Sequence, residues 1–324
     1  MDDRQNAMEI IRFGKPERVM SALPAREVGY LGANQQGYGD TGMSDGHQRP
    51  AGSRWLDIWG TGWVKDHHEA MGFPCHFPLT EPALLRDYVW PDPDDERVYG
   101  PIYQAAGQRD PRDGPWLSGS HRSTLWERAY MLAGMENMMA FFFTEPAFAR
   151  EVLGRIMDFQ CGVARHYARA GVETASLGDD LGTQISLLVG MDIFHGFLEP
   201  EYRRLFDFYK RRNIIVSFHS CGHVEPLLES FIGLGVDVLN PVQATANSLD
   251  RVIAVTRGRM ALLGGVSTQL LMDGPTEAIR RGVRETIGLL GRDGGYFCAP
   301  DQGMPFPPDH WKAFGEAVAE YGKY

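Results

Sequence analysis

The fold is decided by a short apolar run that ends in polar residues, Ile214-Ile215-Val216-Ser217-Phe218-His219-Ser220-Cys221-Gly222. The run is rich in β-branched side chains and only a few residues long, which is typical of a strand. A stretch of helical length, Pro200–Asn213, precedes it, and another, Val224–Gly233, follows it. The next apolar run is Val236–Pro241. A strand, a helix and a second strand in this order predict a parallel βαβ unit.

The same alternation continues from about residue 113 to the end of the chain. The expected strands share a short apolar run with a small or polar end: Pro115–Ser120, Thr174–Gly178, Ile214–Phe218, Val236–Pro241, Met260–Gly265 and Gly295–Ala299. The expected helices lie between them: Thr124–Ala140, Pro146–Ala170, Pro200–Asn213, Val224–Gly233, Ser248–Thr256 and Pro275–Gly291. At least six such units suit an α/β fold with a closed (β/α)₈ TIM barrel better than an open sheet. No Gly-x-Gly-x-x-Gly pattern follows the first strand, which disfavours a dinucleotide-binding fold.

The first part of the chain differs in texture and is rich in Trp, Gly, Pro and Asp. We expect residues 1–112 to form an irregular, partly helical N-terminal extension with the first barrel elements. Residues 113–324 are expected to form the main part of the barrel, within a single structural domain. Asp3–Phe13 predicts a helix, whereas Gly32–Gly52, with many glycines and few aliphatic residues, predicts a long loop.

Three tryptophans in this region recur at a spacing of four residues, Trp55, Trp59 and Trp63. The spacing is that of one face of a helix. The first interpretation is packing of this face against the barrel. The alternative is a cleft wall for a flat, apolar substrate.

Composition and charge narrow the classes of partner and of compartment. The 324 residues carry 32 basic and 42 acidic side chains, for a net charge of −10 without a charged block. This balance argues against nucleic acid or an anionic membrane surface as the main partner. No apolar run approaches the length of a membrane-spanning helix, and the first residues lack the apolar stretch of a secretory signal. Four scattered cysteines do not make a disulfide framework, so a reduced, cytoplasmic protein is expected.

In a barrel, the active site lies where strands end and βα loops begin. Several expected strands end in polar groups that would converge on one face. The candidate residues at these ends are His121, Asp179, Asp180, Gln184, His219, Cys221, Asn240, Gln243, Asp301 and Gln302. His121 and Gln243 are predicted as catalytic polar groups at the rim.

His219 and Cys221 give the sharpest signal. Residues two apart on a strand face the same side, so the imidazole and the thiol point the same way at its carboxyl end. A nitrogen and a sulfur donor together are what Zn²⁺ prefers in proteins. The alternative is a histidine that hydrogen-bonds substrate beside an inert, buried thiol.

Asp179 and Asp180 follow an expected strand directly. Neighbouring residues at a strand end face opposite sides, so only one of them can enter the site. We predict Asp180 as a catalytic residue, with Gln184 behind it. The alternative is a helix cap, because aspartate suits the position before a helix.

Several separate stretches of the chain resemble the uroporphyrinogen decarboxylase superfamily, which includes zinc- and corrinoid-linked methyltransferases. They are Leu132-Ala133-Gly134-Met135-Glu136-Asn137, Gly178-Asp179-Asp180-Leu181-Gly182, Phe218-His219-Ser220-Cys221-Gly222, Gly235-Val236-Asp237-Val238-Leu239-Asn240-Pro241-Val242-Gln243, Gly264-Gly265-Val266-Ser267-Thr268-Gln269 and Gly294-Gly295-Tyr296. The resemblance implies a (β/α)₈ barrel with a deep cleft at its carboxyl face. True decarboxylases of the family carry an Arg-Gln-Ala-Gly-Arg element, whereas the corresponding stretch here, near Tyr30–Gln35, has no arginine pair. The resemblance therefore favours the methyltransferase branch.

That branch implies zinc held by His-x-Cys and a distant cysteine, so the metal ligands expected here are His219, Cys221 and Cys298. The distant cysteine is where the chain departs from the pattern. Aligned on Ala299-Pro300, its place is taken by Gln302, and Cys298 lies four residues earlier. Four extended residues span roughly 13 Å, so either the loop brings Cys298 to the metal or an oxygen of Asp180 or Asp301 serves instead.

The resemblance implies a zinc-dependent methyltransferase of a corrinoid system. It would move a methyl group between a small substrate, a methyl ether or a thiol, and methylcobalamin or cob(I)alamin carried by a partner corrinoid protein. The expected substrate-binding residues are Gln184, Asn240, Asp301 and Gln302. The main alternative is a metal-free decarboxylase or lyase that moves protons with Asp180 and His219. A non-catalytic tetrapyrrole- or corrinoid-binding protein on the same scaffold is a third class.

Overall fold

The computed structural model describes residues 1–33, 50–66, 72–108 and 114–324. The chain forms two compact units. The first unit comprises Met1–Ala25, Asp180–Met191 and Val216–Tyr324, and the second comprises Arg26–Asp179 and Asp192–Ile215. The expected long loop Gly32–Gly52 lies almost wholly outside the described residues. The expected N-terminal extension, residues 1–112, and main barrel part, residues 113–324, within one structural domain stay a prediction.

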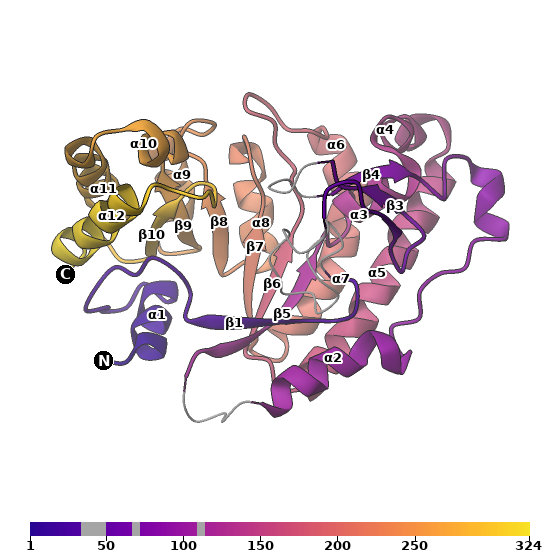
Figure 1. Ribbon diagram of the computed structural model, residues 1–324, viewed down its shortest axis with the longest axis horizontal. Helices are drawn as coiled ribbons and strands as arrows, with labels where there is room; N and C mark the ends of the chain where they lie inside the picture. The colour runs from indigo at the N-terminus through magenta and orange to yellow at the C-terminus, as the bar shows by residue number, and fades with distance from the viewer. Residues whose placement is uncertain (34–49, 67–71, 109–113) are drawn as a thin grey trace. The chain divides into compact units, whose positions relative to one another are not determined.

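The first unit is built on parallel strands in the order β7-β8-β9-β10. Figure 1 shows β8, β9 and β10 side by side, with α11 and α12 packed together beside them. The elements of this unit are α1 (Asp3–Ile11), β7 (Ile215–His219, which begins at the boundary), η3 (Glu225–Leu227), α8 (Leu228–Leu234), β8 (Val238–Val242), α9 (Leu249–Thr256), β9 (Ala261–Val266), α10 (Thr268–Asp273), α11 (Thr276–Leu290), β10 (Tyr296–Pro300) and α12 (Pro308–Tyr321).

The second unit holds a parallel pair, β5 and β6, and a separate antiparallel sheet in the order β2-β3-β4. Its elements are β1 (Ala25–Gly29, which begins at the boundary), β2 (Arg54–Leu56), β3 (Gly62–Val64), β4 (Phe73–His76), η1 (Pro82–Arg86), α2 (Glu96–Gly107), β5 (Trp116–Arg122), α3 (Trp126–Ala133), α4 (Met135–Thr144), α5 (Pro146–Arg169), β6 (Thr174–Gly178), η2 (Phe194–Leu198) and α7 (Glu199–Lys210), with α6 (Met191–Ile193) at the boundary. The expected α/β class, with short parallel strands separated by helices, is confirmed. Among the described residues, the expected helix Thr124–Ala140 is two helices, because Gly134 has φ +86 and ends α3.

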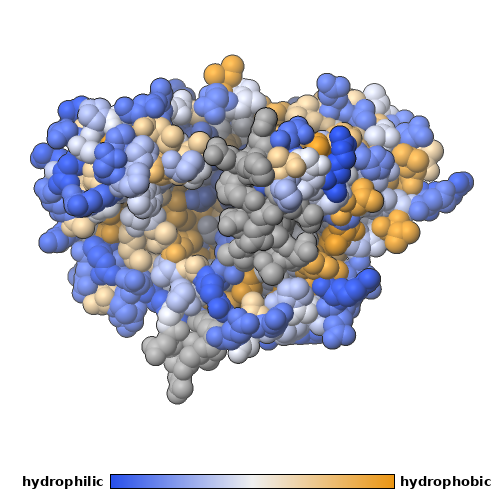
Figure 2. Space-filling model, viewed as in Figure 1, coloured by the Kyte–Doolittle hydropathy of each residue, from blue (hydrophilic) through white to orange (hydrophobic). Residues whose placement is uncertain are grey.

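Helices cover the strands through apolar faces of helical period. In α5, Val152, Ile156, Phe159 and Val163 are buried at spacings of three and four residues. Pro146 lies at the first turn of this helix, where its missing N–H costs nothing. The face in Figure 2 is mostly hydrophilic, with hydrophobic residues in smaller groups. None of the helices in the described parts of the chain is long and apolar enough to cross a membrane.

The three tryptophans do not lie on one helix, and that expectation is wrong. Trp55 and Trp63 face each other across the antiparallel strands β2 and β3, and their rings stack 6.2 Å apart. Asp57 accepts the backbone N–H groups of Trp59 and Thr61 and thereby shapes the turn between the strands. Trp55 and Trp63 pair across the hairpin, and Trp59 lies in the turn midway between them, so the spacing of four residues arises without a helix.

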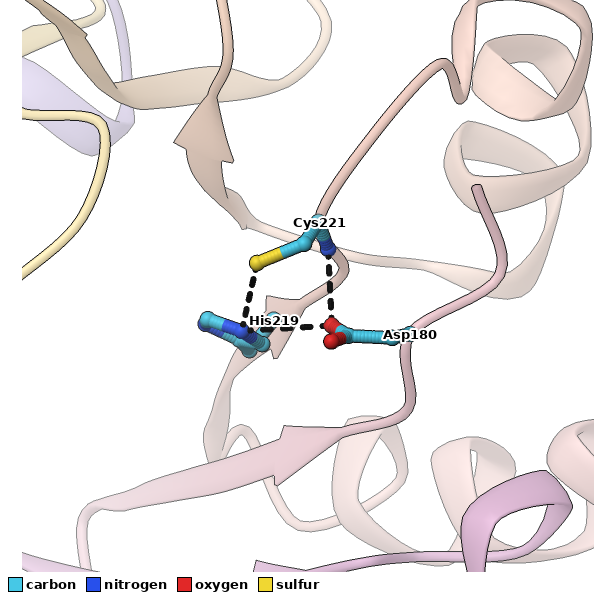
Figure 3. Close-up of side chains that lie close together, drawn as sticks. All are labelled: Asp180, His219 and Cys221. Carbon is cyan, nitrogen blue, oxygen red and sulfur yellow. Dashed lines mark hydrogen bonds and ion pairs between the residues drawn. The ribbon is translucent and has the colours of Figure 1, made fainter. Parts of the chain in front are cut away.

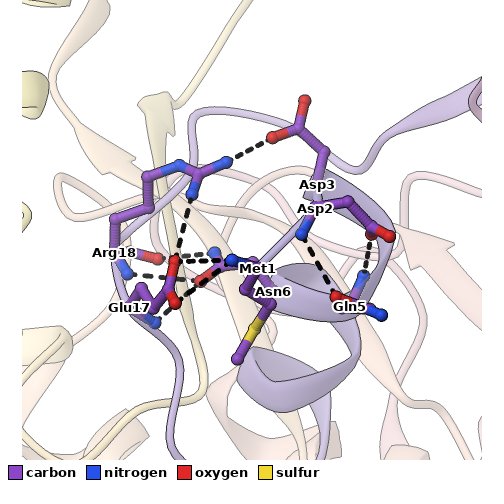
Figure 4. A network of polar contacts seen from close by, with 7 residues as sticks. All are labelled: Met1, Asp2, Asp3, Gln5, Asn6, Glu17 and Arg18. Atoms are coloured by element: carbon purple, nitrogen blue, oxygen red, sulfur yellow. Dashed lines mark hydrogen bonds and ion pairs between the residues drawn. The ribbon is translucent and has the colours of Figure 1, made fainter.

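The N-terminal segment supports the outer edge of β10. Asp2 caps α1 by accepting the N–H of Gln5 at 2.7 Å, and buried Asn6 exchanges hydrogen bonds with the backbone of Glu17 and Arg18 (Figure 4). The chain then reaches Met20, whose carbonyl oxygen accepts the Cys298 N–H at 2.8 Å and which pairs in parallel with Phe297. The segment around Met20 therefore pairs in parallel with the outer edge of β10 within the first unit.

Candidate metal centre

Three potential ligand side chains converge in the first unit (Figure 3). His219 is the last residue of β7, Cys221 follows two residues later, and Asp180 comes two residues after β6. The His219 Nε2 atom lies 3.3 Å from the Cys221 Sγ atom and 3.5 Å from the Asp180 Oδ1 atom. All three residues are half-buried, and their ligand atoms lie within 4.8 Å of one another. In the described parts of the chain, no other group of three His, Cys, Asp or Glu side chains comes this close.

Backbone hydrogen bonds hold the two loops of the site in register. The Cys221 N–H donates to Asp180 Oδ1 at 2.9 Å, and the Leu181 N–H donates to the buried Ser220 hydroxyl at 3.0 Å. The His223 N–H donates to the Thr183 carbonyl at 2.7 Å. The loop after β6 and the loop after β7 each supply both donors and acceptors to the other. The Asp180 carboxylate and the Cys221 thiol therefore keep a fixed position relative to each other.

Two glycines allow this close approach. Gly222 has φ +84, and a Cβ atom there would lie 2.4 Å from the carbonyl carbon and oxygen of Gly182. A Cβ at Gly182 would in turn lie 2.6 Å from the His223 nitrogen. Neither contact is possible for a real side chain, so the loops can meet only where both positions lack one.

The amide side chains of the β8 region orient the ligands. Asn240 Oδ1 lies 2.9 Å from His219 Nδ1 and accepts its N–H, so Nε2 is the nitrogen that faces the thiol and the carboxylate. Gln243 accepts the N–H of Gly222, and Asn247 donates to the Gly222 carbonyl oxygen at 2.9 Å. Histidines that bind metals commonly have their other nitrogen held in this way.

The charges of the three groups favour a cation among them. Burial alone would raise the pKa of Asp180, but hydrogen bonds from His219 and the Cys221 N–H lower it below its usual range. Burial alone would lower the pKa of His219, but its contacts with Asp180 and Cys221 outweigh this and raise it to about 10. The site therefore binds a proton tightly, and a divalent ion would compete with it for the same donors.

The donor set fits zinc. Zinc bound to nitrogen at about 2.0 Å and to sulfur at about 2.3 Å in a tetrahedron places these atoms about 3.5 Å apart. The 3.3 Å from His219 Nε2 to Cys221 Sγ is close to this value. The 3.5 Å from Nε2 to Asp180 Oδ1 is close to the roughly 3.3 Å that zinc bonds of about 2.0 Å to nitrogen and oxygen give in a tetrahedron. One thiolate, one carboxylate and one neutral imidazole carry two negative charges, which balance Zn²⁺.

The remaining predicted site residues of the first unit differ in their contacts and in their burial. The Gln302 Nε2 atom donates to Cys221 Sγ at 2.7 Å, while Asp301 accepts the Thr268 N–H at 2.9 Å. Gln184 is exposed in the loop after β6. The Cys298 thiol is fully buried on β10, where burial raises its pKa to about 12, and it is not part of the three-residue group. Of the oxygen donors expected as alternatives to Cys298, Asp180 lies in this group, and the identity of the third ligand stays a prediction.

His121 and Asp179 make structural contacts in the second unit. His121 is fully buried, with Nδ1 2.7 Å from Gln160 Oε1 and Nε2 hydrogen-bonded to the Tyr209 hydroxyl, and burial lowers its pKa to about 4. Asp179 accepts the N–H groups of Leu125 and Glu127 at the start of α3. Asp179 thus contacts the start of a helix that precedes it by more than fifty residues, which differs from the local helix cap considered for the aspartate pair, and Asp180 lies in the three-residue group.

Sequence reasoning missed the residues that hold the loops, namely Gly182, Ser220, Gly222 and Asn247. The glycines could have been found, because each follows a predicted ligand by one or two positions at a strand end. Ser220 and Asn247 act through backbone contacts that the sequence does not display.

Comparisons with known proteins show which family the chain resembles. Residues 119–321 match the family described as Uroporphyrinogen decarboxylase (URO-D). A methylated-thiol–coenzyme M methyltransferase of Methanosarcina mazei is 26% identical over 253 residues, 76% of this chain and 66% of that protein. The match therefore spans just under two thirds of the relative's length. A solved methyltransferase structure from Methanosarcina mazei has a TM-score of 0.73 at 16% identity, with 99% of both chains covered, which shows a shared fold.

Proposed function

Because the chain belongs to the uroporphyrinogen decarboxylase (URO-D) family and resembles a methyltransferase within it, we propose that it is a zinc-dependent methyltransferase of a corrinoid system. It would move a methyl group between a small methyl ether or thiol and a cobalamin carried by a partner corrinoid protein. The observation that carries the proposal is the meeting of His219 Nε2, Cys221 Sγ and an Asp180 oxygen within 4.8 Å. We expect it to act in the cytoplasm, where a free thiol stays reduced.

Each residue of the site has a separate part in this proposal. His219, Cys221 and Asp180 would hold the zinc, which when bound would supply Lewis acidity toward the atom that carries the methyl group. Asn240 keeps the proton of His219 on Nδ1 and so presents Nε2 as a donor. Asp180 also accepts the Cys221 N–H, which fixes the distance between its carboxylate and the thiol.

Elemental analysis of the purified protein tests the metal. We expect about one zinc per chain, as in other sites with three protein ligands, and loss of zinc in His219→Ala and Cys221→Ser. Cys75→Ser is the matched control, since it removes an exposed thiol from the second unit. Cys298→Ser tests the other expected ligand and should keep its zinc. A wild-type protein without zinc after growth in zinc-supplemented medium would overturn the proposal.

Methyl transfer is tested with free methylcobalamin as a substitute for the partner. Wild-type protein should demethylate it in the presence of an acceptor thiol, or methylate cob(I)alamin from an aryl methyl ether, with the spectral change of the corrinoid as readout. His219→Ala should lose this activity together with its zinc. No turnover in either direction by a zinc-loaded protein would contradict a methyltransferase.

A metal-free decarboxylase or lyase is the second candidate. It is favoured by the contact between Asp180 and His219, which holds a proton at the site and raises the pKa of His219 to about 10. This candidate predicts release of carbon dioxide from a small acid by zinc-free protein, abolished by Asp180→Asn. Zinc dependence of turnover excludes it.

A further inference from the structure

Gln302 makes a direct contact with the sulfur of the site. Its Nε2 atom donates to Cys221 Sγ at 2.7 Å, across 81 residues of sequence. Gln302 follows β10 by two positions and is half-buried. The sulfur of Cys221 therefore has two nitrogen neighbours, His219 Nε2 and the Gln302 amide.

The backbone from which this side chain departs is fixed by Thr268, the first residue of α10. The Gln302 N–H donates to the Thr268 hydroxyl at 2.8 Å, and that hydroxyl donates to the Gln302 carbonyl oxygen at 3.1 Å. The Thr268 N–H in turn donates to the buried carboxylate of Asp301 at 2.9 Å. Because Thr268 bonds to both the N–H and the carbonyl oxygen of Gln302, the backbone that carries the amide is fixed before any ligand arrives.

The position of Gln302 also limits the number of thiolates in the site. Cys221 supplies the single sulfur of the three-residue group, and the Cys298 thiol is fully buried and belongs to no such group among the described residues. The Gln302 side chain contacts the Cys221 sulfur directly and itself carries no thiolate. A glutamine there adds a hydrogen-bond donor and no negative charge.

We propose that Gln302 is the specificity-determining residue of the site: its amide fixes the Cys221 sulfur, keeps the metal at one thiolate, and makes oxygen rather than sulfur the preferred exchangeable ligand. This inference rests on the proposed function and assigns its substrates to the methyl ethers and alcohols rather than the thiols. A hydrogen bond to a thiolate draws electron density from the sulfur. A metal with one thiolate and one carboxylate is harder than one with two thiolates, and harder ions prefer oxygen ligands.

Cobalt(II)-substituted protein tests the ligand set without any turnover. Gln302→Leu keeps a side chain of similar size without the donor, and should weaken cobalt binding about tenfold, as loss of an outer hydrogen bond to a ligand does. Gln302→Cys should raise the thiolate-to-cobalt charge-transfer absorbance in proportion to a second sulfur ligand. Gln269→Leu is the matched control, because Gln269 is an exposed glutamine beside Thr268 in α10, and it should behave as wild type. Thermal melting of each metal-free variant identifies any that fails to fold.

Titration of the cobalt proteins with phenol and with ethanethiol tests the preference. The ratio of phenol to ethanethiol affinity should fall about tenfold from wild type to Gln302→Cys, in line with the softer ligand set. Folded Gln302 variants with wild-type cobalt affinity, absorbance and ligand ratio would overturn the inference and leave the zinc site standing. A wild-type protein that binds neither zinc nor cobalt would instead overturn the proposed function.

Discussion

In the parallel pairing of β7 and β8, His219 lies opposite Asn240, and the two side chains meet at 2.9 Å between Nδ1 and Oδ1. The register of the sheet thus determines which nitrogen of His219 faces Cys221 and Asp180. A shift of one residue would turn Asn240 to the other face of the sheet and release the imidazole. The geometry of the candidate ligands is therefore a property of strand pairing as well as of the loops that follow the strands.

Removal of the Asn240 acceptor should weaken metal binding without abolishing it. Asn240→Ala leaves all three ligands in place but frees the imidazole to rotate and to change tautomer, so zinc affinity should fall about 10- to 100-fold. Asn240→Asp keeps an oxygen at the same place and should restore most of the affinity. Competition with a chromogenic chelator measures both. Equal affinity in Asn240→Ala and wild type would show that Nδ1 needs no partner.

The contact between Gly182 and Gly222 should not tolerate a side chain. Gly222→Ala combines a left-handed backbone with a Cβ 2.4 Å from Gly182, so we expect loss of zinc and of more than about 2 kcal/mol in the free energy of unfolding. Gly258→Ala is the control, because Gly258 also has positive φ, +71, but nothing within 4 Å of its Cβ position. It should lose about 1 kcal/mol and keep its zinc. Urea unfolding and elemental analysis distinguish the backbone strain at positive φ from the collision of the new Cβ with Gly182. Equal losses of stability and of zinc in the two variants would show that the collision has no effect.

Substitution of the two adjacent aspartates should change different properties, the stability of the protein for Asp179 and zinc binding for Asp180. Asp179→Ala leaves the N–H groups at the start of α3 and the Tyr202 hydroxyl without their acceptor, so metal-free protein should lose about 2 kcal/mol of stability. Its zinc content should be close to wild type if it folds. Asp180→Ala should show the reverse, with zinc lost and less change in the stability of the metal-free protein. Denaturant unfolding and zinc analysis on both variants check the assignment, and loss of zinc from Asp179→Ala alone would reverse it.

The strands and the proximity of His219 to Cys221 could be predicted from the sequence because local patterns determine them. The expected strand Thr174–Gly178 agrees with β6, and Ile214–Phe218 agrees with β7 to within one residue. Buried parallel strands are continuous apolar runs, and these runs are easily recognised. The spacing of His219 and Cys221 was informative for the same reason, since both belong to one strand end.

The remaining parts of the site depend on contacts between distant segments. The amide of Gln302 reaches Cys221 only because β10 and α10 hold its backbone, and no local pattern records this. Cys298 has the right chemistry for a metal ligand, but its residue in β10 points the thiol into the core. The tryptophan spacing was misleading because a short hairpin can imitate the period of a helix.

Acidification should destabilise the protein through His121. Nδ1 donates to Gln160 Oε1, since the Gln160 amide nitrogen already donates to Thr124, and Nε2 must then accept from the Tyr209 hydroxyl. This arrangement requires a neutral ring, and burial lowers its pKa from 6.5 to about 4. The folded protein thus binds a proton less readily than the unfolded chain, so the contribution of His121 to stability is complete above pH 6.5 and is lost as the pH falls toward 4. The change amounts to at most about 3 kcal/mol.

In urea unfolding of metal-free protein, His121→Gln should be less stable than wild type at pH 7 and lose less stability on acidification. His76→Gln, which removes an exposed histidine from the same unit, should keep the wild-type dependence on pH. If His121→Gln and wild type lose stability in parallel between pH 6.5 and 4, the ring is not held neutral by its buried partners.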